Sequence, residues 1–166
     1  MARIDRAALD RAVAAVVAQS GGPGGVLGVV LDGQVIHRHA WGLADPASRS
    51  PMGPQTLFPI CSISKQFTCA LIDGLADDPA ALNPHLAGWL PNLQDPLPGI
   101  ADLANNQSGL RDSWALTVLH GAAHDGVFQA GDAVTLLRRM RRTQFAPGSR
   151  YSYANGNFHI LGAIAE

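Results

Sequence analysis

Residues 59–67 read Pro-Ile-Cys-Ser-Ile-Ser-Lys-Gln-Phe and contain a Ser-x-x-Lys pattern formed by Ser62 and Lys65. Helical periodicity begins here and continues to Ala76, where Asp77-Asp78-Pro79 ends it. Residues three apart on a helix share a face, so the spacing places the serine hydroxyl beside the amine. The start of the helix also offers backbone N–H groups next to Ser62. The segment therefore predicts a nucleophilic serine with a basic partner at a loop-to-helix junction.

Lys65 is the only lysine in the chain, which has eleven arginines. A serine hydroxyl needs a neighbouring base to take its proton, and an amine can do this where an arginine cannot. The use of lysine at this one position favours a proton-handling role over the alternative, a surface lysine at a helix start. We expect the neighbouring Cys61, Phe67, Cys69 and Leu71 to give the amine apolar surroundings.

A second pattern, Tyr153-Ala154-Asn155, lies 88 residues after Lys65 in a Gly-rich stretch. A tyrosine and an asparagine two residues apart in a tight loop can reach one site. Tyrosine can pass a proton to a leaving group, and the asparagine amide can bind a substrate amide. The alternative interpretation is an aromatic residue packed over a core. Ser62, Lys65 and Tyr153 are the candidate catalytic residues, and Asn155 is the candidate substrate-binding residue.

The composition excludes some classes of partner. The 166 residues suffice for one sizeable core, and a net charge of −1 gives no electrostatic reason to expect nucleic acid or an anionic membrane. The exception is the basic run Arg138-Arg139 and Arg141-Arg142. We interpret it as a solvated end of a helix, with phosphate or partner binding as the alternative.

The two cysteines and the N-terminus indicate the compartment. Cys61 and Cys69 are eight residues apart, about 12 Å along a helix, too far for a disulfide. We interpret them as buried thiols in a reducing compartment. The apolar stretch Ala12–Ala18 follows charged residues in helical alternation, which favours an amphipathic helix over a signal peptide. No apolar run reaches the length of a membrane span. The sequence therefore predicts a cytoplasmic protein.

The patterns elsewhere predict an α+β fold. We expect a helix over residues 5–19, a hairpin of strands 26–31 and 34–41 joined by Asp32-Gly33, and a loop over 45–59. Residues 80–142 are typical of helices joined by Pro- and Gly-containing loops. A last helix starts near Tyr153 and shows no stop signal before the chain ends. A lone hairpin is also marginally stable, so we expect the chain to be part of a longer polypeptide.

Taken together, these motifs resemble the serine β-lactamase and penicillin-binding-protein superfamily, which has Ser-x-x-Lys, Tyr-x-Asn and a later Lys/His-Thr/Ser-Gly element. Within it, the chain is similar to the bacterial D-aminopeptidases. The resembling blocks are residues 22–25, 39–42, 59–70, 105–112 and 151–158.

The resemblance implies a β-lactamase-like domain of which the chain is the N-terminal portion, with a sheet part over about 1–60 and a helical part over about 61–166. It also implies release of N-terminal D-residues, chiefly D-alanine, through an acyl-enzyme on Ser62. Lys65 and Tyr153 would share general-base and general-acid work, and the Ser62 N–H would be one oxyanion donor. No cofactor or metal is implied, and a homodimer is implied for the full-length parent.

The sequence departs from the family at the third element, because no His-x-Gly strand follows. His159 comes too soon after Asn155, and His120-Gly121 lies in the helical region. The remaining sheet and the second oxyanion donor are missing with it, so we expect little turnover from the isolated chain. The alternatives are a β-lactamase-like esterase, another penicillin-recognising hydrolase, a non-catalytic penicillin-binding module and an inert fragment.

Overall fold

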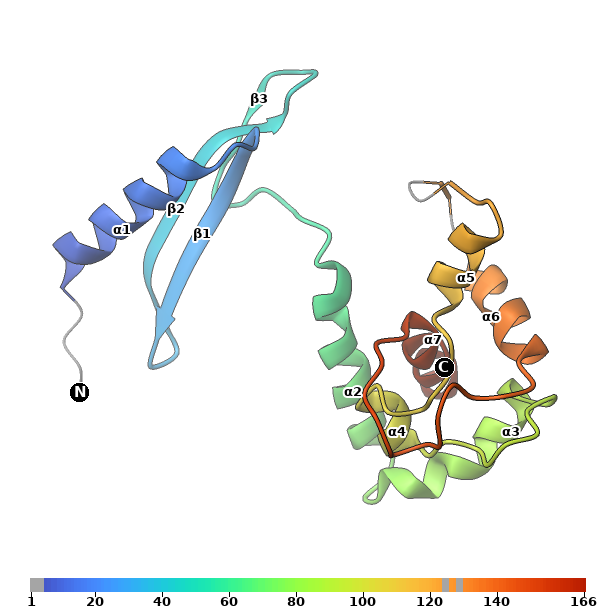
Figure 1. Cartoon of the computed structure of the whole chain (residues 1–166). Coiled ribbons are helices and arrows are strands. Elements are labelled where there is room, and N and C mark those ends of the chain that lie inside the picture. The colour runs from blue at the N-terminus through green and yellow to red at the C-terminus, as the bar shows by residue number, and fades with distance from the viewer. Residues whose placement is uncertain (1–4, 124–125, 128–129) are drawn as a thin grey trace. The chain divides into compact units, whose positions relative to one another are not determined.

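The computed structural model describes residues 5–123, 126–127 and 130–166. The chain forms two compact units, Met1–Pro59 and Ile60–Glu166 (Figure 1). The first unit contains one helix and a small sheet. The second is helical and contains all four candidate site residues.

The first unit consists of α1 (Arg6–Gln19), β1 (Gly24–Leu31), β2 (Gln34–Asp45) and β3 (Ser50–Pro51), and the antiparallel sheet has the order β1-β2-β3. Asp5 caps α1, since its carboxylate accepts hydrogen bonds from the backbone nitrogens of Ala7 and Ala8 at 2.9 and 3.3 Å. Asp32 and Gly33 both have positive φ, 49° and 76°, as a two-residue hairpin turn requires. The predicted helix and hairpin are confirmed, and both strands are longer than predicted. The loop prediction for residues 45–59 missed β3.

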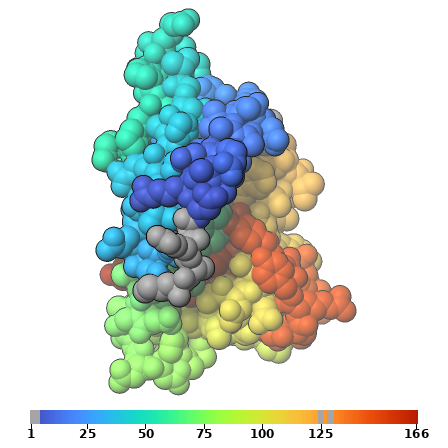
Figure 2. All heavy atoms as spheres, turned by 90° about the vertical axis from the view of Figure 1, so that its left-hand side faces the viewer, coloured from blue at the N-terminus to red at the C-terminus, as the bar shows by residue number. Residues whose placement is uncertain are grey.

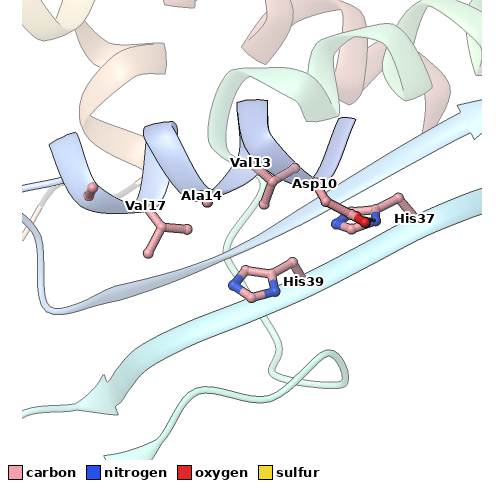
Figure 3. Close-up of a pocket in the computed structure, with 7 residues that line it drawn as sticks. Asp10, Val13, Ala14, Val17, His37 and His39 are labelled. Atoms are coloured by element: carbon pink, nitrogen blue, oxygen red, sulfur yellow. Dashed lines mark ion pairs between the residues drawn. The ribbon is translucent and has the colours of Figure 1, made fainter. Parts of the chain in front are cut away.

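The helix α1 packs against one face of β2. Val13 is the buried residue of α1, and Val13, Ala14 and Val17 face the strand (Figure 3). The indole N–H of Trp41 donates to Ser20 Oγ at 3.0 Å, which ties β2 to the residue that follows the helix. The opposite side of α1 is solvent-exposed, and its atoms are uncovered on the face shown in Figure 2.

The second unit begins with a 3₁₀ turn, η1 (Cys61–Ile63), that leads into α2 (Ser64–Leu75). The further elements are η2 (Pro79–His85), α3 (Leu86–Trp89), α4 (Ile100–Ala104), α5 (Ser113–Leu119), α6 (Ala130–Arg139) and α7 (Asn155–Ala165). The predicted helical character of residues 80–142 is confirmed. The last helix was predicted to start at Tyr153, but it starts at Asn155, because Ala154 is extended, with φ −143° and ψ 116°.

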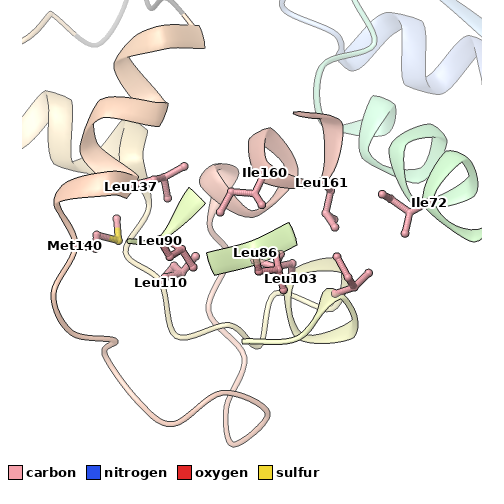
Figure 4. Packing of buried hydrophobic residues seen from close by; sticks show 10 residues of the cluster. Ile72, Leu86, Leu90, Leu103, Leu110, Leu137, Met140, Ile160 and Leu161 are labelled. Carbon is pink, nitrogen blue, oxygen red and sulfur yellow. The ribbon is translucent and has the colours of Figure 1, made fainter. Parts of the chain in front are cut away.

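The core of this unit is built around α7, which contacts α2, α4, α5 and α6. Figure 4 shows Ile160 and Leu161 of α7 between Leu137 of α6 and Ile72 of α2. Burying each such side chain contributes about 1.5–3 kcal/mol. Because α7 begins two residues after Tyr153, this packing fixes the position of the Tyr153–Asn155 segment. The buried cluster comprises Ile72, Leu86, Leu90, Ile100, Leu103, Leu110, Leu137, Met140, Ile160 and Leu161.

Two further features bear on the predictions. Among the described residues, no helix combines the length and the apolar character needed to cross a bilayer. The four arginines of the basic run are exposed, and Arg138 and Arg139 lie in the last turn of α6, where the helix dipole favours positive charge. The Arg138 guanidinium also lies 5.7 Å from the ring centroid of Trp89.

Candidate active site

Ser62 lies in the 3₁₀ turn, and Lys65 lies in the first turn of α2. The ammonium Nζ of Lys65 donates to Ser62 Oγ at 3.1 Å, as the Ser-x-x-Lys spacing predicts. The chain enters the turn through Cys61, whose φ of 47° is in the left-handed region that a side chain disfavours. Such a conformation costs about 1–3 kcal/mol. The Ser64 hydroxyl donates to the Cys61 carbonyl and helps to hold the turn.

Tyr153 and Asn155 join this pair from the start of α7, the helix that packs against α2. Tyr153 Oη lies 2.7 Å from Ser62 Oγ, and Lys65 Nζ donates to Asn155 Oδ1 at 3.0 Å. The four side chains therefore form one connected hydrogen-bonded group, Tyr153–Ser62–Lys65–Asn155. The sequence named all four as candidates, and the structure brings all four together.

The surroundings of Lys65 differ from the prediction. Phe67 and Leu71 are 59% and 62% exposed, because residues two and six positions further along a helix point away from the face that carries Lys65. The apolar neighbours are instead the rings of Tyr153 and Phe158, whose centroids lie 5.0 and 5.3 Å from Nζ. Aromatic faces at this range attract a cation.

The two cysteines are less buried than predicted. The prediction of a buried thiol is wrong for Cys61, which is exposed where the chain enters the turn. Cys69 is half-buried; desolvation, together with the nearby carboxylate of Asp73, raises its pKa. A raised pKa keeps the thiol protonated and less reactive.

The site perturbs two titratable groups. Partial burial acts to raise the pKa of Tyr153, but its interactions with Lys65 and Ser62 outweigh this and hold the pKa below the ordinary value. The pKa of His159 is also lowered, first by burial and then by the charge of Lys65. A tyrosine that loses its proton more readily is better suited to accept a proton from a serine.

A buried polar network holds the segment that carries Tyr153 and Asn155. Ser108 Oγ donates to Asn157 Oδ1 at 2.7 Å, and Asn157 Nδ2 donates to Asn106 Oδ1 at 3.2 Å. Asn106 Oδ1 also accepts the backbone N–H of Ala154 at 3.2 Å. Paired polar groups in a core fix a geometry, because leaving any of them unpaired is costly. The sequence indicated this loop only through the resemblance of residues 105–112 to the family. It did not predict that the loop fixes the segment that carries Tyr153 and Asn155.

The close approach of this loop to the chain near Phe145 requires glycine at position 109. Gly109 has φ 73°, and a Cβ there would lie 2.3 Å from the Phe145 carbonyl oxygen. The backbone N–H of Gln144 donates to the Gly109 carbonyl at 2.7 Å. A side chain at position 109 would push this loop away from the chain near Phe145 and so move the segment that leads to Tyr153.

Two cavities flank the four residues. One, of about 190 Å³, is polar and is lined by Ser64, Lys65, Thr68, Asn155, Phe158 and His159. The other, of about 380 Å³, is lined by Arg111, Asp112, Ala115, Leu116, Leu119, Gln144, Ser152 and Tyr153. Both are open to solvent, one beside Lys65 and Asn155 and the other beside Tyr153.

A cavity larger than these two lies elsewhere, between α1 and β2 in the first unit (Figure 3). It has a volume of about 450 Å³, and His37 and His39 lie on one side of it. His37 Nδ1 lies 3.4 Å from Asp10 Oδ1, and the rings of His37, His39 and Trp41 stack along the strand. The described residues that line it include no serine or cysteine. Over the described ranges, no three His, Cys, Asp or Glu side chains are grouped as metal ligands.

The arrangement is that of the β-lactamase-like fold. The chain superposes on an octameric penicillin-binding protein homologue from Pyrococcus abyssi with a TM-score of 0.68, over 98% of this chain and 39% of that one, at 23% identity. It also superposes on the D-amino acid amidase from Ochrobactrum anthropi SV3 with a TM-score of 0.66, over 95% of this chain and 42% of that one, at 26% identity.

The chain belongs to the beta-lactamase family, which its residues 9–166 match. Its sequence is 51% identical to a D-aminopeptidase from Brucella canis over all 166 residues. The chain spans 32% of the length of that relative. The predicted superfamily and the predicted α+β, β-lactamase-like fold are therefore confirmed.

Proposed function

We propose that this chain is part of a serine hydrolase that releases N-terminal D-residues, chiefly D-alanine, from peptides and amides. The observation that carries the proposal is the placement of Ser62 Oγ, which lies 3.1 Å from Lys65 Nζ and 2.7 Å from Tyr153 Oη. The 51% identity to a D-aminopeptidase supports the choice of substrate class. Its two compact units are, in this proposal, the sheet part and the helical part of a single catalytic domain.

The proposed reaction begins at the serine. Ser62 Oγ attacks the substrate carbonyl carbon while Tyr153, helped by Lys65, takes the hydroxyl proton. The negative charge on the carbonyl oxygen is stabilised by the backbone N–H of Ser62. Collapse of this intermediate breaks the C–N bond, and the proton held by Tyr153 passes to the leaving amine. Water then hydrolyses the acyl-enzyme with the same groups acting in reverse.

Lys65 and Asn155 support these steps. The ammonium of Lys65, within 5.0 Å of the Tyr153 ring centroid, stabilises the phenolate that a base requires. Asn155 uses its Oδ1 to accept from Lys65. Its amide nitrogen is therefore placed to donate to the carbonyl of a substrate amide.

A comparison of substrates on the polypeptide as its host produces it tests this function. We expect hydrolysis of D-alanine p-nitroanilide to exceed that of the L-isomer, and Ser62→Ala to abolish it. Preference for a p-nitrophenyl ester or a β-lactam over both would instead indicate an esterase or a β-lactamase. A stable adduct with a labelled β-lactam, without release, would indicate a penicillin-binding module.

Two further expectations come with the proposal. The isolated 166-residue chain should turn over little D-alanine amide, since the sequence has no His-x-Gly element after Asn155. Substantial turnover by this chain alone would contradict that. The longer polypeptide should sediment as a homodimer without any cofactor.

A further inference from the structure

Asp112 uses its two carboxylate oxygens to join two helices. Oδ2 accepts the backbone N–H of Ala115 at 3.1 Å and so caps the start of α5. Oδ1 accepts the backbone N–H of Asn155 at 2.6 Å, at the start of α7 and 43 residues further along the chain. A helix cap needs only one oxygen, so the second bond serves the Asn155 segment.

This second bond lies next to the candidate catalytic group. Asn155 is two residues after Tyr153, and its Oδ1 binds Lys65. A carboxylate that fixes the backbone of Asn155 therefore fixes the position of Asn155, the partner of Lys65, and of Tyr153, the partner of Ser62. Ala154, between them, is held on its other side by Asn106.

The charge of Asp112 acts on the same group. Asp112 and Tyr153 line one cavity, together with Arg111. Of the described residues, the charged groups beside Tyr153 are Asp112 and Arg111, which share its cavity, and Lys65 on α2. The titratable His159 of α7 lines the second cavity, with Lys65. The negative charge of Asp112 acts to raise the pKa of Tyr153 and of His159, opposite to the charge of Lys65.

We propose that Asp112 is a positioning residue, whose carboxylate anchors the Tyr153–Asn155 segment against Ser62 and balances the charge of Lys65 at the phenol. Its importance for catalysis rests on the proposed function. The effect of Asp112 on the ionisation of Tyr153 does not rest on the proposed function, because that ionisation is measured without any substrate.

The chain offers a direct measurement, because it contains two tyrosines, Tyr151 and Tyr153. In Tyr151→Phe, ultraviolet titration of tyrosinate reports Tyr153 alone. The exposed side chain of Tyr151 makes this background substitution mild. Adding Asp112→Asn removes the charge and keeps an oxygen that can accept from Asn155.

We expect Asp112→Asn to lower the titration midpoint of Tyr153 by about 0.5–1 pH unit, the effect of losing one nearby negative charge. Asp112→Glu keeps the charge and should leave the midpoint closer to the background. If Asp112 acted only as a structural cap, Asp112→Asn and Asp112→Glu would change the titration midpoint of Tyr153 to a similar extent. A midpoint that stays constant or rises in Asp112→Asn overturns the proposal.

Asp95→Asn is the matched control. The Asp95 carboxylate also holds a distant segment, since Oδ2 accepts from the backbone nitrogen and the hydroxyl of Thr143 at 2.7 and 3.2 Å. It is not part of the group around Tyr153, so its variant should leave the tyrosinate midpoint unchanged. Circular dichroism at neutral pH checks that each variant is folded. In the longer polypeptide, Asp112→Asn should shift the pH–rate profile in the same direction as the titration.

Discussion

Ser62 Oγ lies 2.7 Å from Tyr153 Oη, although 91 residues separate the two along the chain. Lys65 completes the contact, since its Nζ donates to the same serine oxygen. Ser62 therefore has a hydrogen-bonding partner on each side, one local in sequence and one distant. This relationship underlies the predictions that follow.

Replacement of Lys65 by arginine should slow the chemistry although it keeps the positive charge. The guanidinium is planar and larger than an ammonium, so it cannot reproduce the contacts of Nζ with Ser62 Oγ and Asn155 Oδ1. We expect Lys65→Arg to slow acylation of Ser62 by about 10²–10⁴-fold in the active polypeptide, because Tyr153 then lacks the partner that supports its role as general base. The rate is read from burst kinetics with D-alanine p-nitroanilide. Arg138→Lys, at the exposed end of α6, is the control. An arginine variant that acylates normally would show that only the charge of Lys65 matters.

Removal of the Lys65 ammonium should raise the pKa of Tyr153. Burial raises the pKa of Tyr153, but contact with Lys65 and Ser62 lowers it further than burial raises it. In Tyr151→Phe, we expect a tyrosinate midpoint below the ordinary value of about 10. Lys65→Met should raise that midpoint, because burial then acts without the opposing charge. An unchanged midpoint would mean that Lys65 does not act on the phenol.

Acid should destabilise the fold through His159. Its pKa is lowered in the folded state, first by burial and then by the charge of Lys65, from an ordinary value of 6.5. Below pH 6.5 the unfolded chain binds a proton at this residue more readily than the folded chain does. The stability contributed by neutral His159 is therefore complete above that pH and is lost as the pH falls through the folded pKa.

Urea unfolding at a series of pH values measures this effect. His159→Gln should show a shallower loss of stability between neutral and acid pH than the parent chain. His120→Gln, at an exposed histidine, should keep the parent's pH dependence. Parallel curves for the parent chain and His159→Gln would contradict the prediction.

Loss of the buried amide at position 157 should both destabilise the unit and disturb the site. Asn157 is fully buried and bonds to Ser108 and Asn106. Asn157→Ala leaves those partners unpaired, which costs about 1–3 kcal/mol. Because Asn106 also holds Ala154, the tyrosinate midpoint of Tyr153 should move toward its ordinary value. Asn92→Ala, at an exposed side chain, is the control. Stability is measured by urea unfolding.

Local patterns predicted much of the fold correctly. Helix α1, the Asp32-Gly33 turn and the start of α2 are decided by residues close together in sequence. The local features are a helix cap, a positive-φ turn and a three-residue spacing between Ser62 and Lys65. Local spacing also led to errors. It assigned Phe67 and Leu71 to the surroundings of Lys65, yet both are exposed. It extended the last helix to Tyr153, where bonds to Asn106 keep the chain extended.

The sequence by itself determined which side chains are available for chemistry. The single lysine, three residues after a serine on a helix, specifies a pair that forms from helical geometry alone. Only the tertiary structure decided that Tyr153 meets this pair, that Tyr153 and Phe158 surround the ammonium, and that Asp112 anchors Asn155. The reason is that contacts between residues so far apart in sequence depend on how α2, α5 and α7 pack, and that packing is set by the whole buried core.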